Sequence, residues 1–151
     1  MSWIVAPEYL SMFLLLIILG YSYYDRTVTT LTRVSFRLAL FVSLFAIACN
    51  IIGIYAIEHA DVVPLPLNIA LNTTYFWMTV TMVFCISFAC LAILYEDRHR
   101  TKSFAVASRV MFVIYALHLP LYIVNLSTGW LFSFDASLNY VRGPLNAVVP
   151  M

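Results

Sequence analysis

Several polar side chains lie within long apolar stretches of this sequence, where they could bind a ligand, transfer a proton or join helices. Asn50 stands inside one uncharged stretch, and Asn68 and Asn72 are four residues apart near the start of another. Because this spacing places both amides on one face of a helix, they can bond a neighbouring helix or line a ligand site, and Asn50 is likewise expected to bond a neighbouring helix. His118 is ionisable at membrane depth, which suggests a proton or ligand role; the alternative is a neutral imidazole bonded to a backbone carbonyl beside Pro120.

A second set of polar residues occupies the segment 125–145, NLSTGWLFSFDASLNYVRGPL. Its glycines and aromatic residues predict a short hairpin-like or re-entrant cap, residues 125–142, lying over the helices. Asp135 and Arg142 are spaced to pair across this cap, although exposed pairs contribute only about 0–1 kcal/mol. The cap either covers a small-molecule or peptide site or is a loop that packs down on the helices.

The sequence contains no arrangement that predicts catalysis. It lacks a nucleophile–base arrangement, a phosphate-binding glycine loop, paired catalytic carboxylates and a zinc motif, and its three cysteines lie in apolar runs without metal-ligand spacing. The net charge of +1 provides no general attraction for nucleic acid. We therefore expect no catalytic residue, no metal, no cofactor and no nucleic-acid partner.

Long uncharged stretches define the elements that position these residues. The chain is 64% hydrophobic and 10% charged, and a run of ~20 apolar residues is enough to cross a ~30 Å hydrocarbon core. We predict an all-α integral membrane protein in which Pro120 should kink the last full helix unless a neighbour compensates for the lost hydrogen bond. The expected bundle has four transmembrane helices, at 3–24, 34–57, 65–95 and 104–130, and the start of a fifth from 143.

The basic residues predict the orientation of these helices. Short polar segments, which we call breaks, separate the predicted helices. Seven of the eight basic residues fall in the first and third breaks or beside them, and the second break, residues 58–61, has none. Since the positive side faces the cytoplasm, the N-terminus and residues 58–65 and 124–142 are expected outside. The seven are Arg26, Arg33, Arg37, Arg98, Arg100, Lys102 and Arg109.

Two segments resemble a family of bacterial membrane sensors. VPLPLNIALNTTYFW, at 63–77, is similar to a P-x-x-L-N-x-x-x-N-x-x-Y-F signature, and STGWLFSFDASLNYVRGPL, at 127–145, to a TG-x-I-F-x-F-D…Y-x-R-G-P-L-Y loop. The family comprises N-terminal seven-helix domains that precede GGDEF diguanylate cyclase, histidine kinase or DNA-binding output domains. The matching positions are Pro66, Leu67, Asn68, Asn72, Tyr75, Phe76, Gly129, Phe132, Phe134, Asp135, Tyr140, Arg142, Gly143, Pro144 and Leu145.

The resemblance implies that the chain, residues 1–151, is part of a sensory domain that stops within its fifth helix. It implies a location in the bacterial cytoplasmic membrane, an extracellular small molecule or peptide as signal, and a homodimer in the full-length protein. Asn68, Asn72, Tyr75, Asp135, Tyr140 and Arg142 would then bind the ligand. The chain departs from the family at Asn146, where an aromatic residue is usual, and at Asn50, where an acidic residue is common.

Two other classes of protein remain open from the sequence. A structural or assembly subunit would use its asparagines and small residues to bind partner helices and would have no ligand. A small transporter would require polar residues at the midplane and repeat symmetry, whereas only Asn50 and His118 lie near mid-depth. We rank the sensor first, the structural subunit second and the transporter third.

Overall fold

Four long helices and one short hairpin make up the computed structural model of the chain, which describes residues 6–24, 30–96, 101–137 and 139–144. The helices are α1 (Ala6–Tyr24), α2 (Thr30–Glu58), α3 (Leu65–Glu96) and α4 (Thr101–Thr128), and the strands are β1 (Phe132–Phe134) and β2 (Tyr140–Arg142). Each helix is long and apolar enough to cross a membrane, which confirms the predicted all-α class. The fifth helix was expected from residue 143; Gly143 and Pro144 are not α-helical, and the remaining residues, 145–151, lie outside the described residues.

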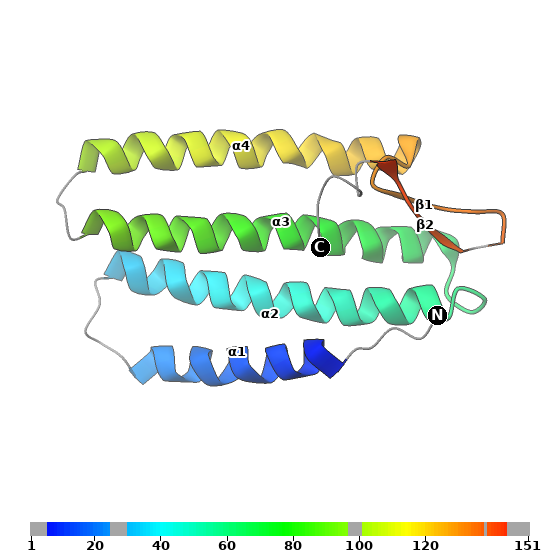
Figure 1. Cartoon of the computed structure of the whole chain (residues 1–151), viewed down its shortest axis with the longest axis horizontal. Coiled ribbons are helices and arrows are strands. Elements are labelled where there is room, and N and C mark those ends of the chain that lie inside the picture. Colours follow the sequence, from blue (N-terminus) through cyan, green and yellow to red (C-terminus); the bar gives the residue numbers. More distant parts are fainter. Residues whose placement is uncertain (1–5, 25–29, 97–100, 138, 145–151) are drawn as a thin grey trace.

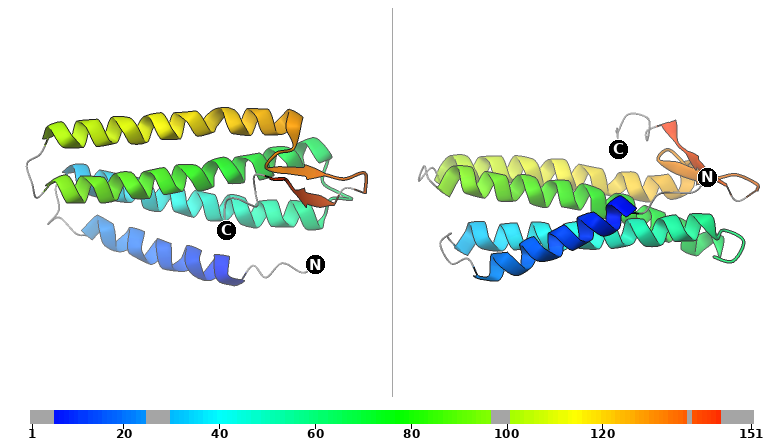
Figure 2. Two further views of the ribbon diagram at one scale, coloured as in Figure 1. Left: turned by 45° about the horizontal axis from the view of Figure 1, so that its top comes forward. Right: turned by 60° about the horizontal axis from the view of Figure 1, so that its bottom comes forward.

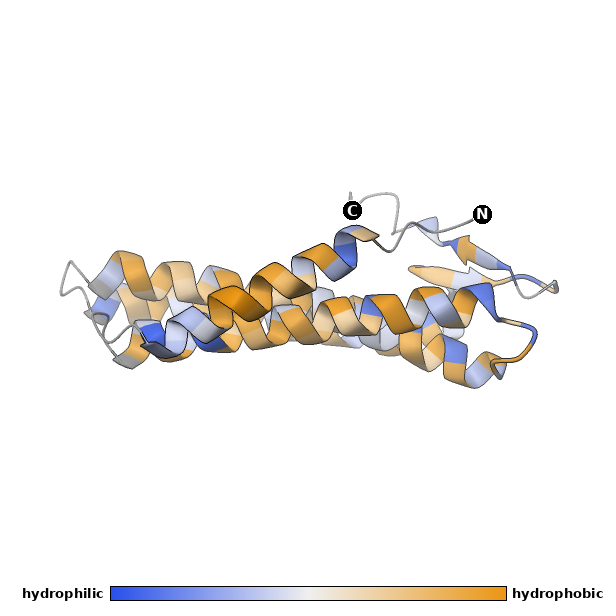
Figure 3. Ribbon diagram, turned by 90° about the horizontal axis from the view of Figure 1, so that it is seen from below, coloured by the Kyte–Doolittle hydropathy of each residue, from blue (hydrophilic) through white to orange (hydrophobic). Residues whose placement is uncertain are grey.

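The helices follow one another side by side, in chain order, and alternate in direction (Figure 1). One end of the molecule, which we call the hairpin end, holds the start of α1 and α3, the end of α2 and α4, and the strands. α1 crosses α2 obliquely (Figure 2), and it is the least buried of the four helices. Hydrophobic residues fill the middle of the helices, while the hydrophilic ones gather towards the two ends (Figure 3).

Small side chains hold α2 against α3, the most extensive helix pair in the structure. Without a hydrophobic driving force between helices in lipid, close backbone approach and dispersion contacts stabilise such pairs. On α2 a stripe of small residues recurs every three or four positions, and small residues of α3 face it. The two sets are Ala39, Ser43, Ala46, Cys49, Gly53 and Ala56 on α2, and Cys85, Ala89 and Ala92 on α3.

The predicted helix boundaries hold to within a few residues. α2 begins at Thr30 rather than 34, and α4 begins at Thr101 rather than 104. α4 ends at Thr128 rather than 130, because Gly129 takes a positive φ of 63° and turns the chain towards β1. The helix continues through Pro120 and runs without a sharp bend in Figures 1 and 2, so the expected kink is absent.

Four of the five basic residues among those described gather in one half of the molecule. Arg33, Arg37, Lys102 and Arg109 are all in the half of the molecule opposite the hairpin end, and Arg142 lies in the hairpin. Arg37 also joins two helices, because its guanidinium donates to the carbonyl of Ser22 near the C-terminus of α1. It lies over the ring of Tyr23 as well, 4.3 Å from the ring centroid. A cation at a helix C-terminus is stabilised by the exposed carbonyls there.

Candidate ligand site beneath the hairpin

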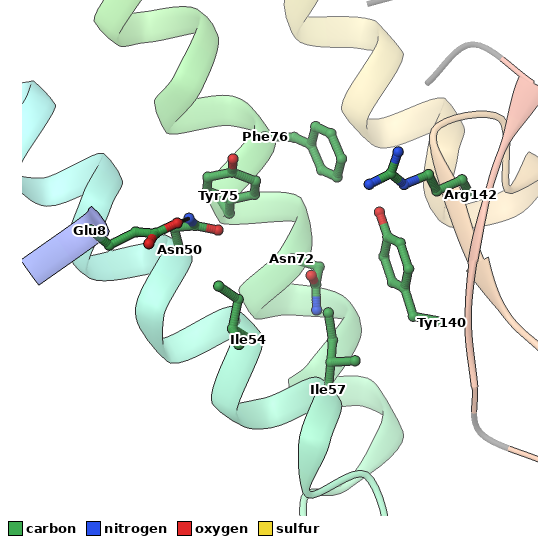
Figure 4. Close-up of a pocket in the computed structure, with 10 residues that line it drawn as sticks. Glu8, Asn50, Ile54, Ile57, Asn72, Tyr75, Phe76, Tyr140 and Arg142 are labelled. Carbon is green, nitrogen blue, oxygen red and sulfur yellow. Dashed lines mark hydrogen bonds between the residues drawn. The ribbon is translucent and has the colours of Figure 1, made fainter. Parts of the chain in front are cut away.

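A cavity of about 220 Å³ lies at the hairpin end, between the first three helices and β2. Its walls combine charged, amide, aromatic and aliphatic side chains (Figure 4). The lining residues are Glu8 from α1, Asn50, Gly53, Ile54 and Ile57 from α2, Asn72, Tyr75 and Phe76 from α3, and Tyr140 and Arg142 from β2. The cavity therefore joins segments from the beginning, middle and end of the described chain.

Helical spacing explains how α2 lines one wall of the cavity. Asn50, Gly53, Ile54 and Ile57 follow one another at intervals of three, one and three residues, so they share one face. Gly53 contributes open space, because it has no side chain where α2 passes α3. A Cβ atom added there would lie 3.7 Å from Oδ1 of Asn72, in ordinary contact. A longer side chain at residue 53 would extend into the cavity.

A chain of amide hydrogen bonds fixes the orientation of Asn72. Asn68 is completely buried, and its Nδ2 donates to the carbonyl of Ala56 at 2.8 Å, joining α3 to the last turn of α2. Nδ2 of Asn72 donates to Oδ1 of Asn68 at 2.8 Å and to its carbonyl at 2.9 Å. With its amide nitrogen engaged in this way, Asn72 turns Oδ1 towards Gly53 and the cavity. Asn68 therefore joins α3 to α2, whereas Asn72 is bonded to Asn68 and also lines the cavity.

Glu8 is the lining residue that the sequence analysis missed. It lies in the first turn of α1, and its Oε1 accepts a hydrogen bond from Nδ2 of Asn50 at 3.2 Å. Its Oε2 is buried without a partner among the described residues. The available signal was a single carboxylate directly before the uncharged stretch 9–24, since an acidic residue at membrane depth is costly and marks a site. Asn50, predicted to join helices, does so through this carboxylate.

The hairpin covers the cavity through its aromatic face. β1 pairs antiparallel with β2, with Phe132 opposite Arg142 and Phe134 opposite Tyr140, so these four side chains share one face. Phe132 is 3% exposed and stacks on Phe76 of α3, with ring centroids 5.6 Å apart, and on Tyr140 at 5.7 Å. This stacking brings Tyr140 and Arg142 to the cavity, where Figure 4 shows both beside Phe76.

The base of the hairpin is fixed by Asn125 and Gly143. Oδ1 of the buried Asn125, on α4, accepts hydrogen bonds from the backbone N–H groups of Leu131 at 2.6 Å and Phe132 at 3.3 Å. The N–H of Gly143 donates to the carbonyl of Leu131 at 2.9 Å. A Cβ atom on Gly143 would overlap the carbonyl oxygens of Gly129 and Trp130, so only glycine fits. The role of Asn125 was not predicted from the sequence.

Asp135 stabilises the turn of the hairpin and does not line the cavity. Its Oδ1 accepts from the N–H groups of Ser137 and Asn139, both at 2.8 Å, and Oδ2 accepts from Nδ2 of Asn139 at 3.3 Å. The backbone N–H of Asn139 is the main cause that lowers the pKa of Asp135 below its ordinary value. The expected pair of Asp135 with Arg142 does not form, because the carboxylate points into its own turn.

His118 lies on α4 and is not among the cavity residues. Its Nδ1 is 2.7 Å from the carbonyl of Ile114, one turn earlier in the same helix. This contact matches the predicted alternative of an imidazole bonded to a backbone carbonyl. Of the predicted ligand-binding residues, the structure thus brings Asn72, Tyr75, Tyr140 and Arg142 together around one cavity.

The chain matches no known family model, and no characterised protein or solved structure is significantly similar to it. Function must therefore be argued from the cavity. Its walls can accept hydrogen bonds at Glu8 and Asn72 and donate them at Arg142, around an apolar middle of aromatic and aliphatic side chains. Such a mixture of an apolar pocket with a few convergent polar groups is typical of small-molecule binding sites.

Proposed function

We propose that this chain is the membrane-embedded sensory part of a bacterial signalling protein and binds its signal in the cavity beneath the hairpin. The observation that carries this proposal is the cavity itself, in which three helices and a folded-over hairpin each contribute a polar side chain. Five of the lining residues, Asn72, Tyr75, Phe76, Tyr140 and Arg142, are also positions at which the sequence resembles the sensor family.

The proposal places the hairpin end on the outer side of the cytoplasmic membrane. Among the described residues, Arg33, Arg37, Lys102 and Arg109 lie in the half of the molecule opposite the hairpin end, and this bias favours the cytoplasmic side for that half. An external molecule then reaches the cavity without crossing the bilayer. The resemblance supplies the rest of the proposal: further helices, a homodimer and a cytoplasmic output domain such as a diguanylate cyclase.

A ligand in this position can act on helix packing. Because it would contact α1, α2, α3 and β2 at once, its affinity depends on how these elements are arranged, and it favours the arrangement that it binds best. α1 is the least buried helix, and its contact at the cavity is the bond of Glu8 with Asn50. We therefore expect the ligand to shift α1 relative to α2 and α3.

A thermal-stability screen with a cavity-filling variant tests this function. The chain in lipid nanodiscs would be heated with a library of small polar metabolites and short peptides. Gly53→Leu extends a side chain into the cavity, and Gly20→Leu is the matched control, because nothing lies within 4 Å of a Cβ atom added at Gly20. We expect a protective compound to raise the melting temperature of the wild type and of Gly20→Leu but not of Gly53→Leu.

Two results would contradict the proposal. One is a library in which no compound protects the wild type, which would favour the structural or assembly subunit. The other is equal protection of Gly53→Leu and Gly20→Leu, which would place any bound compound elsewhere. A flux assay in proteoliposomes distinguishes a sensor from a transporter, because a transporter would move the protective compound across the bilayer.

A further inference from the structure

Two opposite charges line the cavity without meeting. Glu8 reaches it from α1 and Arg142 from β2, and Figure 4 shows them on opposite sides of the space. Within the described part of the chain, Glu8 is bonded to Asn50 and Arg142 has no carboxylate partner. A molecule that contacts both residues must therefore present a positive and a negative group at separate points.

The carboxylate of Glu8 is prepared for a donor that the described residues do not provide. Asn50 donates to Oε1, whereas Oε2 is buried and accepts no hydrogen bond from the residues that the structure describes. A buried acceptor left in this state destabilises the protein, and a charged one more so. An ammonium group of a ligand would supply both the missing hydrogen bond and the compensating charge.

Arg142 offers the complementary chemistry at the other wall. A guanidinium is a planar fork of N–H donors whose geometry matches a carboxylate. The stacking of Phe132 on Phe76 and on Tyr140 holds this part of the hairpin over the cavity, so the position of Arg142 is set by the fold. The cavity middle, between these two ends, includes Phe76 and Ile54, which favour an apolar chain.

We propose that the ligand is a small extended zwitterion, with an ammonium group at Glu8, a carboxylate at Arg142 and an uncharged chain between them. The cavity of about 220 Å³ is below the ~300–1,000 Å³ of sites for drug-sized molecules, which suits such a ligand. Both ω-amino acids and short peptides with free ends have this chemistry. The inference rests on the proposed sensory role of the cavity and names the class of its signal.

Binding of a length series to the chain in nanodiscs tests the charges and their separation. The probes are ω-amino acids from 3-aminopropanoate to 8-aminooctanoate, dialanine and trialanine, with hexylamine and hexanoate as singly charged controls and alanine as the compact zwitterion. We expect one length to bind best. Both singly charged probes and alanine should bind at least about tenfold more weakly than that best probe, because none of them can make charged hydrogen bonds to both Glu8 and Arg142. A preference for the ω-amino acids or for the peptides identifies the source.

Variants that remove a charge test which residue binds each end of the ligand. Glu8→Gln keeps the size and the bond to Asn50, and Arg142→Gln removes the guanidinium; each should weaken the best zwitterion about 10- to 100-fold. The control Arg109→Gln removes a charge outside the cavity and should leave binding unchanged. Glu8→Gln should also leave the affinity for hexanoate unchanged, because hexanoate has no ammonium group to bind Glu8. A variant that failed to fold would lose affinity for hexanoate as well.

Several outcomes would overturn the inference. They are equal binding of zwitterions and singly charged probes, no binding of any zwitterion, binding of alanine as tight as the best extended probe, or insensitivity to Glu8→Gln. If an uncharged compound protects the wild type but not Gly53→Leu in the thermal screen while no zwitterion binds, the ligand class is wrong and the sensory cavity stands. If nothing protects the wild type, both proposals fail.

Discussion

Replacing Asn68 by alanine removes the amide that joins α3 to the end of α2. The Asn68 side chain is completely buried, and its Nδ2 donates to the carbonyl of Ala56 at 2.8 Å. Ala56 lies in the last turn of α2, where a helix carbonyl has no partner within the helix. The substitution therefore leaves this carbonyl without a donor, and it also removes one of the two acceptors of Asn72.

The expected loss of stability follows from these contacts. Hydrogen bonds between membrane helices average about 0.6 kcal/mol and reach about 1.7 kcal/mol. A buried acceptor left unsatisfied costs about 1–3 kcal/mol, and Ala56 is 1% exposed, so this larger range applies. A void of methyl size adds about 1 kcal/mol. We expect Asn68→Ala to lower the free energy of unfolding by about 2–4 kcal/mol.

Reversible unfolding in bicelles with increasing detergent, followed by circular dichroism, measures this free energy. Asn72→Ala should lower it less than Asn68→Ala, because the bond from Asn68 to Ala56 survives. Thr74→Ala is the matched control on the same helix, since its hydroxyl donates to Ala70 one turn away, and it should change stability by less than about 0.5 kcal/mol. The reasoning is refuted if Asn68→Ala costs less than about 1 kcal/mol or no more than Thr74→Ala.

Three further predictions concern the hairpin. Gly143→Ala should displace it, because a Cβ atom overlaps two backbone carbonyls; the fluorescence of Trp130 should change, whereas Gly20→Ala should leave it unchanged. Asn125→Ala removes the acceptor of two backbone N–H groups and should destabilise the hairpin by about 1–3 kcal/mol, measured by amide hydrogen exchange, and Asn125→Asp, which keeps the acceptor, should restore most of it. The pKa of Asp135 is lowered in the fold, so its contribution to stability is complete above the ordinary value of 3.8 and is lost as the pH falls through the lowered value. The protection factors of the turn amides against hydrogen exchange should therefore fall on acidification below about pH 4 in the wild type but not in Asp135→Asn.

The helices could be predicted closely because their signal is local. Uncharged stretches of sufficient length define spans irrespective of what they contact, so α3 was placed to within one residue. The spacing of Asn68 and Asn72 likewise predicted amides on one helix face, one of which joins α3 to α2. Where the prediction differed, a backbone conformation decided: the positive φ of Gly129 ends α4 two residues early.

The site was predicted only in part because its members come from distant elements. Glu8 lies 42 residues before Asn50, and no spacing in the sequence reveals that the two share a hydrogen bond. Asp135 and Arg142 carry opposite charges in one loop, which favoured a pair, yet nearby backbone N–H groups offer the carboxylate closer partners. The role of Asn125 was not predicted because its side chain accepts hydrogen bonds from the backbone of residues beyond the end of α4.

The order of residues along the chain is enough to predict four apolar helices, their positions, and the polar residues that they carry into the apolar interior. Those properties depend on transfer of each segment from water to lipid and on helical spacing, which are local. That Glu8, Asn72 and Arg142 line one cavity while Asp135 lies outside it is a property of the folded arrangement. That decision depends on how the hairpin folds back on α3 and how α1 crosses α2, which are contacts between segments far apart in the chain.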